Sequence, residues 1–197
     1  MLFDSLRTSL ENVSHTLTVI LDKKPGDPAH FTEMPGVRIV DVLETVGACG
    51  SDSASFRAAM AVAKNLDGII VFLEDDYVCT PDWHLVQEGL RFGDYVTLYD
   101  HPDKYEPQYE GIPCTVHKGK YRHWRTTPST TNSYAMTSAT LKRDWDIHAE
   151  YCKGSGITLD HPKFLALWQH GRRLVSCIPS AWSHEEVGMS VDVYVYN

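Results

Sequence analysis

Three consecutive acidic residues, Glu74, Asp75 and Asp76, directly follow the apolar run "GIIVFL", where a buried strand is expected to end. Adjacent carboxylates repel one another and are costly to remove from water. A divalent cation would relieve both costs, and Mg²⁺ or Mn²⁺ often uses one or two protein carboxylates together with phosphate oxygens of a substrate. The spacing therefore predicts a divalent-cation site, with a solvated turn of helix-capping acids as the alternative.

Three further side chains could do chemistry. Asp160 stands at the expected start of a helix, where its ordinary role is an N-cap. His184 stands between Ser183 and Glu185, where a surface histidine is the ordinary interpretation. Arg57 lies one turn inside a predicted helix that follows "GACGSDSAS", whose backbone N–H groups could bind a phosphate; a solvated helix residue is the alternative.

The elements that must position these residues alternate between strand and helix. The residue patterns predict strands over 15–24, 37–44, 68–76, 94–100 and 172–186, and helices over 1–13, 51–66, 80–93 and 160–171. This alternation is typical of an α/β domain. The apolar run before the acids is expected of a central parallel strand covered on both faces. Ligands of open α/β sheets bind at the carboxyl ends of the strands, which is where the three acids stand.

Composition excludes several classes of protein. A length of 197 residues predicts one domain, and 43% hydrophobic with 22% charged residues is typical of a soluble domain with a core. A net charge of −8 argues against a nucleic-acid binder. We expect neither a membrane span nor a signal peptide, because no apolar run is long enough. Five cysteines without a C-x-x-C pair predict reduced thiols, mostly in the core of a cytoplasmic protein, rather than a zinc site.

The stretch "FLEDDYVCTPDW" resembles the metal motif of the GT-A nucleotide-sugar glycosyltransferases. It is especially similar to the E-D-D form of the N-acetylglucosaminyltransferase I group, and to family-2-like transferases. The resemblance implies that Asp76 ligates the Mn²⁺ or Mg²⁺ on the nucleoside diphosphate, and that Glu74 and Asp75 contact the sugar nucleotide.

Three later segments are similar to further GT-A motifs and occur in the family order. "STTNSYAMT" resembles the small-residue loop near the donor sugar, although it has no glycine, so Thr131, Asn132 and Ser133 stand in for the usual residues. "ITLDHPKF" implies Asp160 as the base of an inverting member. "PSAWSHEEVG" implies His184 as a residue that holds metal or diphosphate.

The basic-aromatic segment "YRHWRTTPS" would then lie near the leaving group or the acceptor. Arg122 or Arg125 could neutralise the diphosphate, and Trp124 could stack on a sugar ring. Trp168 falls on a helical face and is expected in the core. Asp100 and His101, where the chain leaves the strand over 94–100, are near-site candidates.

The predicted fold is a single GT-A-like domain over 1–197, with a mixed, mostly parallel sheet flanked by helices. The usual first strand is missing, and "VDVYVYN" or a partner chain would fill that edge. The predicted function is metal-dependent transfer of a sugar from a nucleoside-diphosphate sugar to a glycan or other hydroxyl acceptor. The alternatives are a metal-dependent phosphoester or nucleotide-sugar hydrolase and a non-catalytic glycan-binding domain.

Overall fold

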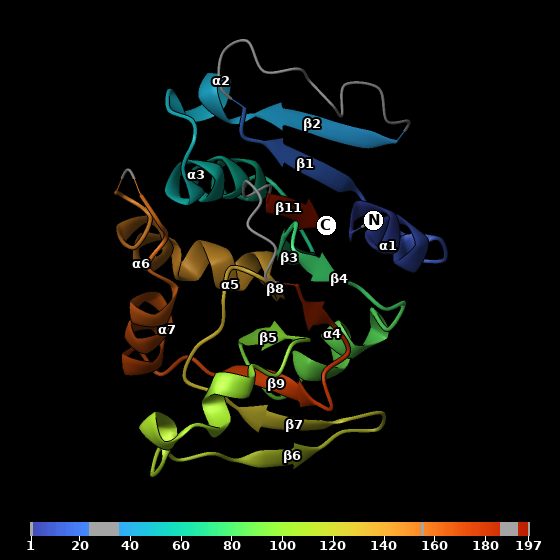
Figure 1. Ribbon diagram of the computed structural model, residues 1–197, viewed down its shortest axis with the longest axis vertical. Helices are drawn as coiled ribbons and strands as arrows, with labels where there is room; N and C mark the ends of the chain where they lie inside the picture. The colour runs from blue at the N-terminus through green and yellow to red at the C-terminus, as the bar shows by residue number, and fades with distance from the viewer. Residues whose placement is uncertain (1, 24–35, 155, 186–192, 197) are drawn as a thin grey trace.

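A computed structural model describes residues 2–23, 36–154, 156–185 and 193–196 (Figure 1). Its main strands are β1 (Leu17–Leu21), β2 (Val37–Asp41), β3 (Ile69–Glu74), β5 (Tyr95–Thr97), β6 (Val116–Lys118), β7 (His123–Thr126), β8 (Tyr134–Thr137), β9 (Leu174–Ile178) and β11 (Val193–Tyr196). Within the described ranges they form one nine-stranded sheet in the order β2-β1-β11-β3-β8-β5-β9-β7-β6. Two short strands, β4 (Tyr77–Val78) and β10 (Ser183–His184), pair separately beside it.

The sheet is mixed rather than mostly parallel. In the part of the chain that the structure describes, only β1–β2 and β5–β9 pair in parallel. β3 lies between two antiparallel neighbours, β11 and β8, so the expectation of parallel neighbours around "GIIVFL" is wrong. The apolar run indicated burial on both faces, which β3 has, but burial does not encode the direction of the neighbouring strands.

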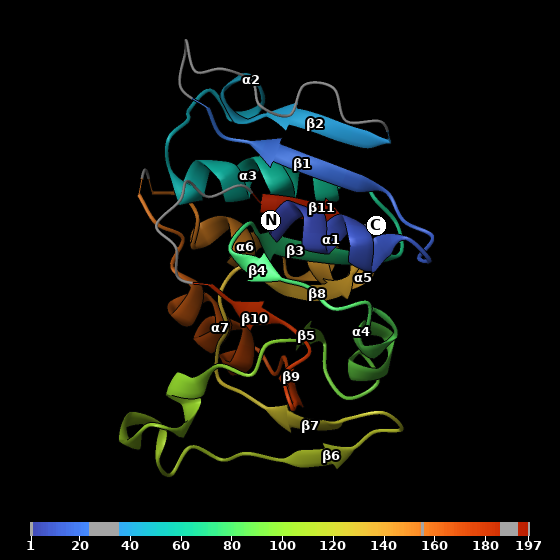
Figure 2. The same cartoon turned by 45° about the vertical axis from the view of Figure 1, so that its right-hand side comes forward.

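Helices cover both faces of the sheet (Figures 1 and 2). Side chains of α2 (Val42–Val46), α3 (Asp52–Ala63), α5 (Ser138–Arg143) and α7 (Asp160–Gln169) share one core cluster with Ile70 and Phe72 of β3. Side chains of α1 (Leu2–Leu10) and α4 (His84–Gly89) share the other cluster with Val71 and Leu73. Successive β3 residues point to opposite faces, as a strand requires. None of the described helices is both long and apolar enough to cross a membrane.

Ser51 caps α3, since its Oγ accepts a hydrogen bond from the backbone N–H of Ala54 at 3.2 Å. Three parts of the chain differ from the helices and strands that the sequence patterns indicated. A short helix, α2, begins at Val42, inside the predicted strand over 37–44. α4 begins at His84 rather than near Pro81, because the chain forms a loop there and Thr80 Oγ1 donates to Asp82 Oδ2 at 3.1 Å. The segment 129–152, whose pattern indicates a short strand leading into one helix, forms β8 and then two helices, α5 and α6 (Trp145–Glu150).

The C-terminal strand β11 lies inside the sheet rather than at its edge. It pairs antiparallel with β1 on one side and with β3 on the other. β1 and β3 therefore run in the same direction, with β11 between them. β11 therefore occupies an interior position where an edge strand was expected; residues 191, 192 and 197 of "VDVYVYN" lie outside the described residues.

Candidate functional site

The three acids stand where β3 ends, and β8 begins beside them. Because β8 runs antiparallel to β3, the residues that precede it lie at the same edge of the sheet. Ser133 Oγ accepts a hydrogen bond from the backbone N–H of Glu74 at 3.0 Å and donates to Glu74 Oε2 at 3.3 Å. The segment 129–137 therefore contacts the acidic motif directly.

Glu74 lies in a strongly acidic environment. Burial, together with the nearby charges of Asp160, Asp76 and Asp52, raises its pKa to about 8, although a hydrogen bond with Thr131 opposes this increase. Four carboxyl groups from three separate segments thus influence one another at this edge. A carboxyl group with a pKa so far from its ordinary value marks a candidate functional site.

Asp76 and His184 form a close pair across the β4–β10 ladder. Asp76 Oδ2 lies 2.9 Å from His184 Nε2, although the two residues are 108 positions apart. The backbone N–H of Glu185 donates to the backbone oxygen of Asp76 at 2.8 Å, and the Tyr77 ring stacks on His184. The second oxygen, Asp76 Oδ1, is buried and has no hydrogen-bond partner among the described residues. The late histidine is therefore adjacent to the acid that the sequence assigned to metal.

Asp160 is held by a buried lysine. Lys163 has no exposed side-chain surface, and its Nζ lies 2.7 Å from Asn132 Oδ1 and 3.1 Å from Asp160 Oδ1. Asn132 Nδ2 also donates to Asp52 Oδ1 at 3.4 Å. Burial raises the pKa of Asp160, and the charge and hydrogen bond of Lys163 partly offset that increase. This network joins the donor-loop residue Asn132 to the predicted base.

Sequence reasoning missed Lys163 and Asp52. Lys163 is three positions after Asp160, the spacing at which helical side chains meet, so this pair was recognisable from the sequence. Asp52 occupies the first turn of α3, where an acid is normally explained by the helix dipole. Nothing local indicates that Asp52 also bonds to the loop before β8.

Two predicted residues complete this edge. Thr131 Oγ1 lies 2.8 Å from the hydroxyl of Tyr77 and accepts from the backbone N–H of Ser133 at 3.4 Å. Asp75 is half-buried in the turn between β3 and β4. Both therefore lie beside Glu74 and Asp76.

Arg57 does not join the acidic edge. Its Nη1 donates to the backbone oxygens of Cys152 at 2.6 Å and Gly154 at 2.9 Å, and so holds the loop after α6. The backbone N–H groups expected to bind a phosphate are also occupied: Gly50 and Ser51 donate to the carboxylate of Asp22 at 2.7 and 3.0 Å. In the predicted phosphate site before α3, these backbone N–H groups are thus already hydrogen-bonded within the chain.

The basic-aromatic segment is largely structural. Trp124 is fully buried, and its indole N–H donates to Glu88 at 3.0 Å, so it offers no face to a sugar. Arg125 is buried in an ion pair with Asp100 at 2.6 Å. Trp168, expected in the core, is instead 61% exposed. Both tryptophan predictions are therefore wrong, because side-chain type and local period do not show which face of an element is covered.

One near-site candidate does lie close to the acids. The rings of His101 and His184 are 6.1 Å apart, and Tyr99 contacts both rings. Burial lowers the pKa of His101 to about 4, so this imidazole is neutral at neutral pH. The rings of Tyr99 and His101 thus lie beside His184.

The arrangement suits a cation that is coordinated partly by the protein and partly by a substrate. Among the described residues, no group of three or more His, Cys, Asp or Glu side chains is arranged to hold a metal ion. Asp76 and His184 nevertheless supply a carboxylate and an imidazole, and Asp76 has an oxygen without a hydrogen-bond partner. Such a pair fits Mg²⁺ or Mn²⁺ when phosphate oxygens and waters complete the coordination.

Comparisons of the sequence with known proteins do not identify this arrangement of residues. No model of a known protein family matches the chain, and no curated protein matches it.

Proposed function

We propose that this protein is a metal-dependent glycosyltransferase that moves a sugar from a nucleoside-diphosphate sugar to a hydroxyl acceptor. One observation carries the proposal: the Asp76–His184 pair, the Glu74–Ser133 pair and the Asp160–Lys163–Asn132 network meet at one edge of the sheet. Their segments are far apart in sequence. The resemblance to GT-A motifs, described above, supplies the chemical interpretation.

The donor would bind on the acids through a cation. Asp76 and His184 would hold Mn²⁺ or Mg²⁺, which when bound supplies Lewis-acid stabilisation of the departing diphosphate. Glu74 and Asp75 would contact the sugar nucleotide. Thr131, Asn132 and Ser133 would lie against the donor sugar, because this loop is hydrogen-bonded to Glu74.

Asp160 would accept the proton of the acceptor hydroxyl if the reaction inverts the anomeric centre. A base works best when its pKa lies near the working pH, and burial moves the pKa of Asp160 in that direction. Lys163 fixes one carboxylate oxygen by a hydrogen bond at 3.1 Å. The other oxygen would face the acceptor.

The test is nucleotide release from UDP-sugars and GDP-sugars in the presence of Mn²⁺. Asp76→Ala should lower turnover by about 100-fold or more, as expected when a group that stabilises the transition state is lost. Asp146→Ala is the matched control, because Asp146 is an exposed acid on α6 and should leave turnover unchanged. Unchanged turnover in the Asp76 variant would refute the metal role. Equal release with and without an acceptor would favour a hydrolase.

A second candidate, a non-catalytic glycan-binding domain, is favoured by the position of β11. GT-A domains usually open with a strand whose end binds the base, and here an antiparallel C-terminal strand lies between β1 and β3. Calorimetry with UDP and GDP, each with and without Mn²⁺, separates the two candidates. Metal-dependent nucleotide binding supports the transferase, whereas its absence supports the binding domain.

A further inference from the structure

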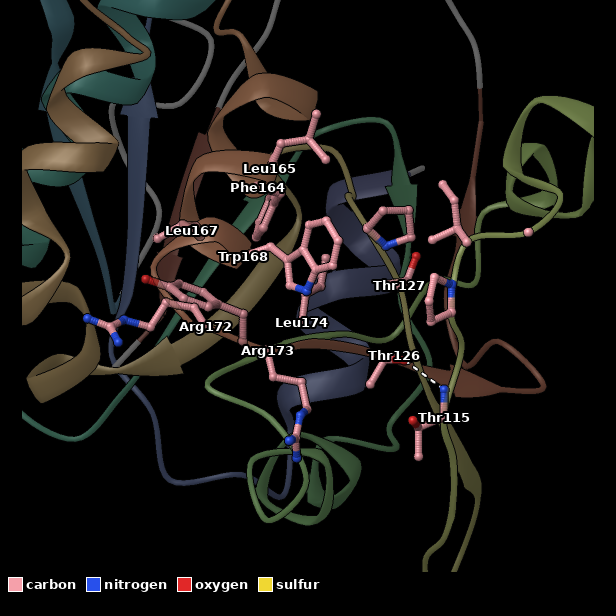
Figure 3. Close-up of a pocket in the computed structure, with 16 residues that line it drawn as sticks. Thr115, Thr126, Thr127, Phe164, Leu165, Leu167, Trp168, Arg172, Arg173 and Leu174 are labelled. Carbon is pink, nitrogen blue, oxygen red and sulfur yellow. Dashed lines mark hydrogen bonds between the residues drawn. The ribbon is translucent and has the colours of Figure 1, made fainter.

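A pocket of about 460 Å³ lies against the second half of α7 and the residues that follow it, Gly171 to Leu174. In Figure 3, α7 forms one wall with Phe164, Leu165 and Trp168. The facing wall comes from two segments, residues 111–113 with 115, and residues 126–128 at the end of β7. Its volume is within the range of small-molecule sites, roughly 300–1,000 Å³.

The lining is aromatic, apolar and hydroxyl-bearing. Trp168 is 61% exposed, and Figure 3 shows its indole turned toward the opposite wall, where Thr127 lies. The guanidinium groups of Arg172 and Arg173 point away from the indole in Figure 3. Arg172 bonds to Asp144, and Arg173 to a backbone oxygen. The interior therefore suits a neutral ligand with one flat apolar face and a polar rim.

A pyranose ring has this combination, with C–H groups on its faces and hydroxyl groups around its edge. An exposed indole provides a large rigid surface for such a face. Thr115, Thr126 and Thr127 place hydroxyl groups on the wall opposite the indole. Among the described residues that line the pocket, only Arg172 and Arg173 are charged, and their guanidinium groups point away from the indole (Figure 3).

Helix α7 connects this pocket to the acidic edge. His161, Phe164, Leu165 and Trp168 are spaced three or four residues apart and form one stripe of the helix. Trp168 stands eight positions after Asp160, which is about 12 Å along the helix axis at 1.5 Å per residue. Ser129 Oγ lies 2.9 Å from His161 Nδ1, so the segment that leaves the pocket follows α7 back toward Asp160.

We infer that the pocket binds a neutral sugar ring of an oligosaccharide acceptor, with the ring face on Trp168 and the reacting end at Asp160. The acceptor role rests on the proposed transferase function. The sugar site itself does not, because it needs neither donor nor cation.

Binding is tested first, without nucleotide or metal. The full chain, ¹⁵N-labelled at its tryptophan indoles, is titrated with the methyl glycosides of glucose, galactose, mannose and N-acetylglucosamine. At least one glycoside should shift the Trp168 indole signal, which is assigned by its loss in Trp168→Phe. Trp168→Ala should raise the dissociation constant about tenfold or more, whereas Tyr121→Ala, at a half-exposed aromatic outside the pocket, should not change it.

Two outcomes overturn the inference: no glycoside shifts the Trp168 signal, or the affinity survives in Trp168→Ala. A shift caused by phenol or indole but by no glycoside overturns the sugar class in favour of an apolar ligand.

The acceptor role is tested separately by acceptor length. Trp168→Ala should raise KM several-fold for tri- and tetrasaccharide acceptors but leave KM for monosaccharide acceptors unchanged. An equal change in KM for long and for monosaccharide acceptors would contradict an acceptor that extends along α7 from Asp160 to Trp168. Glycoside binding at Trp168 without any transfer in the unmodified protein would refute the proposed function and retain the sugar site.

Discussion

The buried pair of Lys163 and Asp160 allows a sharp test of how the acidic edge is stabilised. Lys163 is fully buried, and 24% of the Asp160 side chain is exposed. Replacing Lys163 by Met keeps a long apolar stem of similar volume but removes the cation. Asp160 then keeps its charge beside Asp52 and Glu74 without a partner, and Asn132 Oδ1 loses its donor.

The expected cost follows from the burial of the pair. Removing one partner of a buried ion pair costs about 3–5 kcal/mol. Asp160 is partly exposed, so water can replace some of the lost interaction, and the lower end of that range applies. A loss of about 3 kcal/mol in a domain of this size corresponds to a decrease in Tm of roughly 6–12 °C.

The assay is urea unfolding followed by circular dichroism, with two comparison variants. Lys142→Met removes an exposed lysine from its ion pair with Asp67 and should cost less than about 1 kcal/mol. The double variant Lys163→Met, Asp160→Leu removes both buried charges and should be more stable than Lys163→Met alone. Removing both partners eliminates the unpaired charge.

The deficit of Lys163→Met should also depend on pH. Burial already raises the pKa of folded Asp160 above its unfolded value of 3.8, and loss of the cation raises it further. The folded state then binds more protons than the unfolded state, so the stability of the variant falls as pH rises above about 4. This account would be refuted if Lys163→Met and Lys142→Met lost the same free energy of unfolding. It would also be refuted if the loss in Lys163→Met did not shrink toward pH 4.

Three further predictions concern the structure around the site. Glu88→Gln should lower the free energy of unfolding by about 2–3 kcal/mol and speed hydrogen exchange in the β6–β7 turn. The Glu88 carboxylate accepts hydrogen bonds from backbone N–H groups of that turn. These bonds and that of Trp124 outweigh burial and lower the pKa of Glu88, so the cost should appear above pH 4.5 and shrink below it. Gly89→Ala should lower the melting temperature at a cost of about 1–3 kcal/mol, because an added Cβ would lie 2.7 Å from the Trp124 ring. A thiol reagent monitored by mass spectrometry should label exposed Cys114 in the native state. It should label Cys79, whose pKa burial raises to about 12, only on unfolding.

Local patterns in the sequence determined most of the elements. The apolar run before Glu74 is a buried strand, the β-branched segment near residue 17 is another, and Ser51 caps a helix where the pattern placed one. These properties depend on neighbouring residues alone. The acids at the strand end were also recognisable as an electrostatic anomaly, since three adjacent carboxylates need a local reason.

The tertiary structure alone decided which residues share the site. It placed His184 against Asp76 and Ser133 against Glu74, contacts between segments that a GT-A resemblance anticipated but that no local pattern encodes. It also revealed Lys163 as the buried cation beside Asp160, and Asp22 as the carboxylate that occupies the amides before α3.

The sequence could predict neither the direction of the strands beside β3 nor which tryptophan side chains are buried, and the physical reason is the same for both. The apolar run of β3 is equally compatible with parallel and antiparallel neighbours, because either arrangement buries both faces. Trp124 and Trp168 are the same residue type on regular elements, yet one is fully buried and the other is 61% exposed. Packing partners distant in sequence decide both properties: α4 and its Glu88 cover Trp124, whereas Trp168 faces an open pocket.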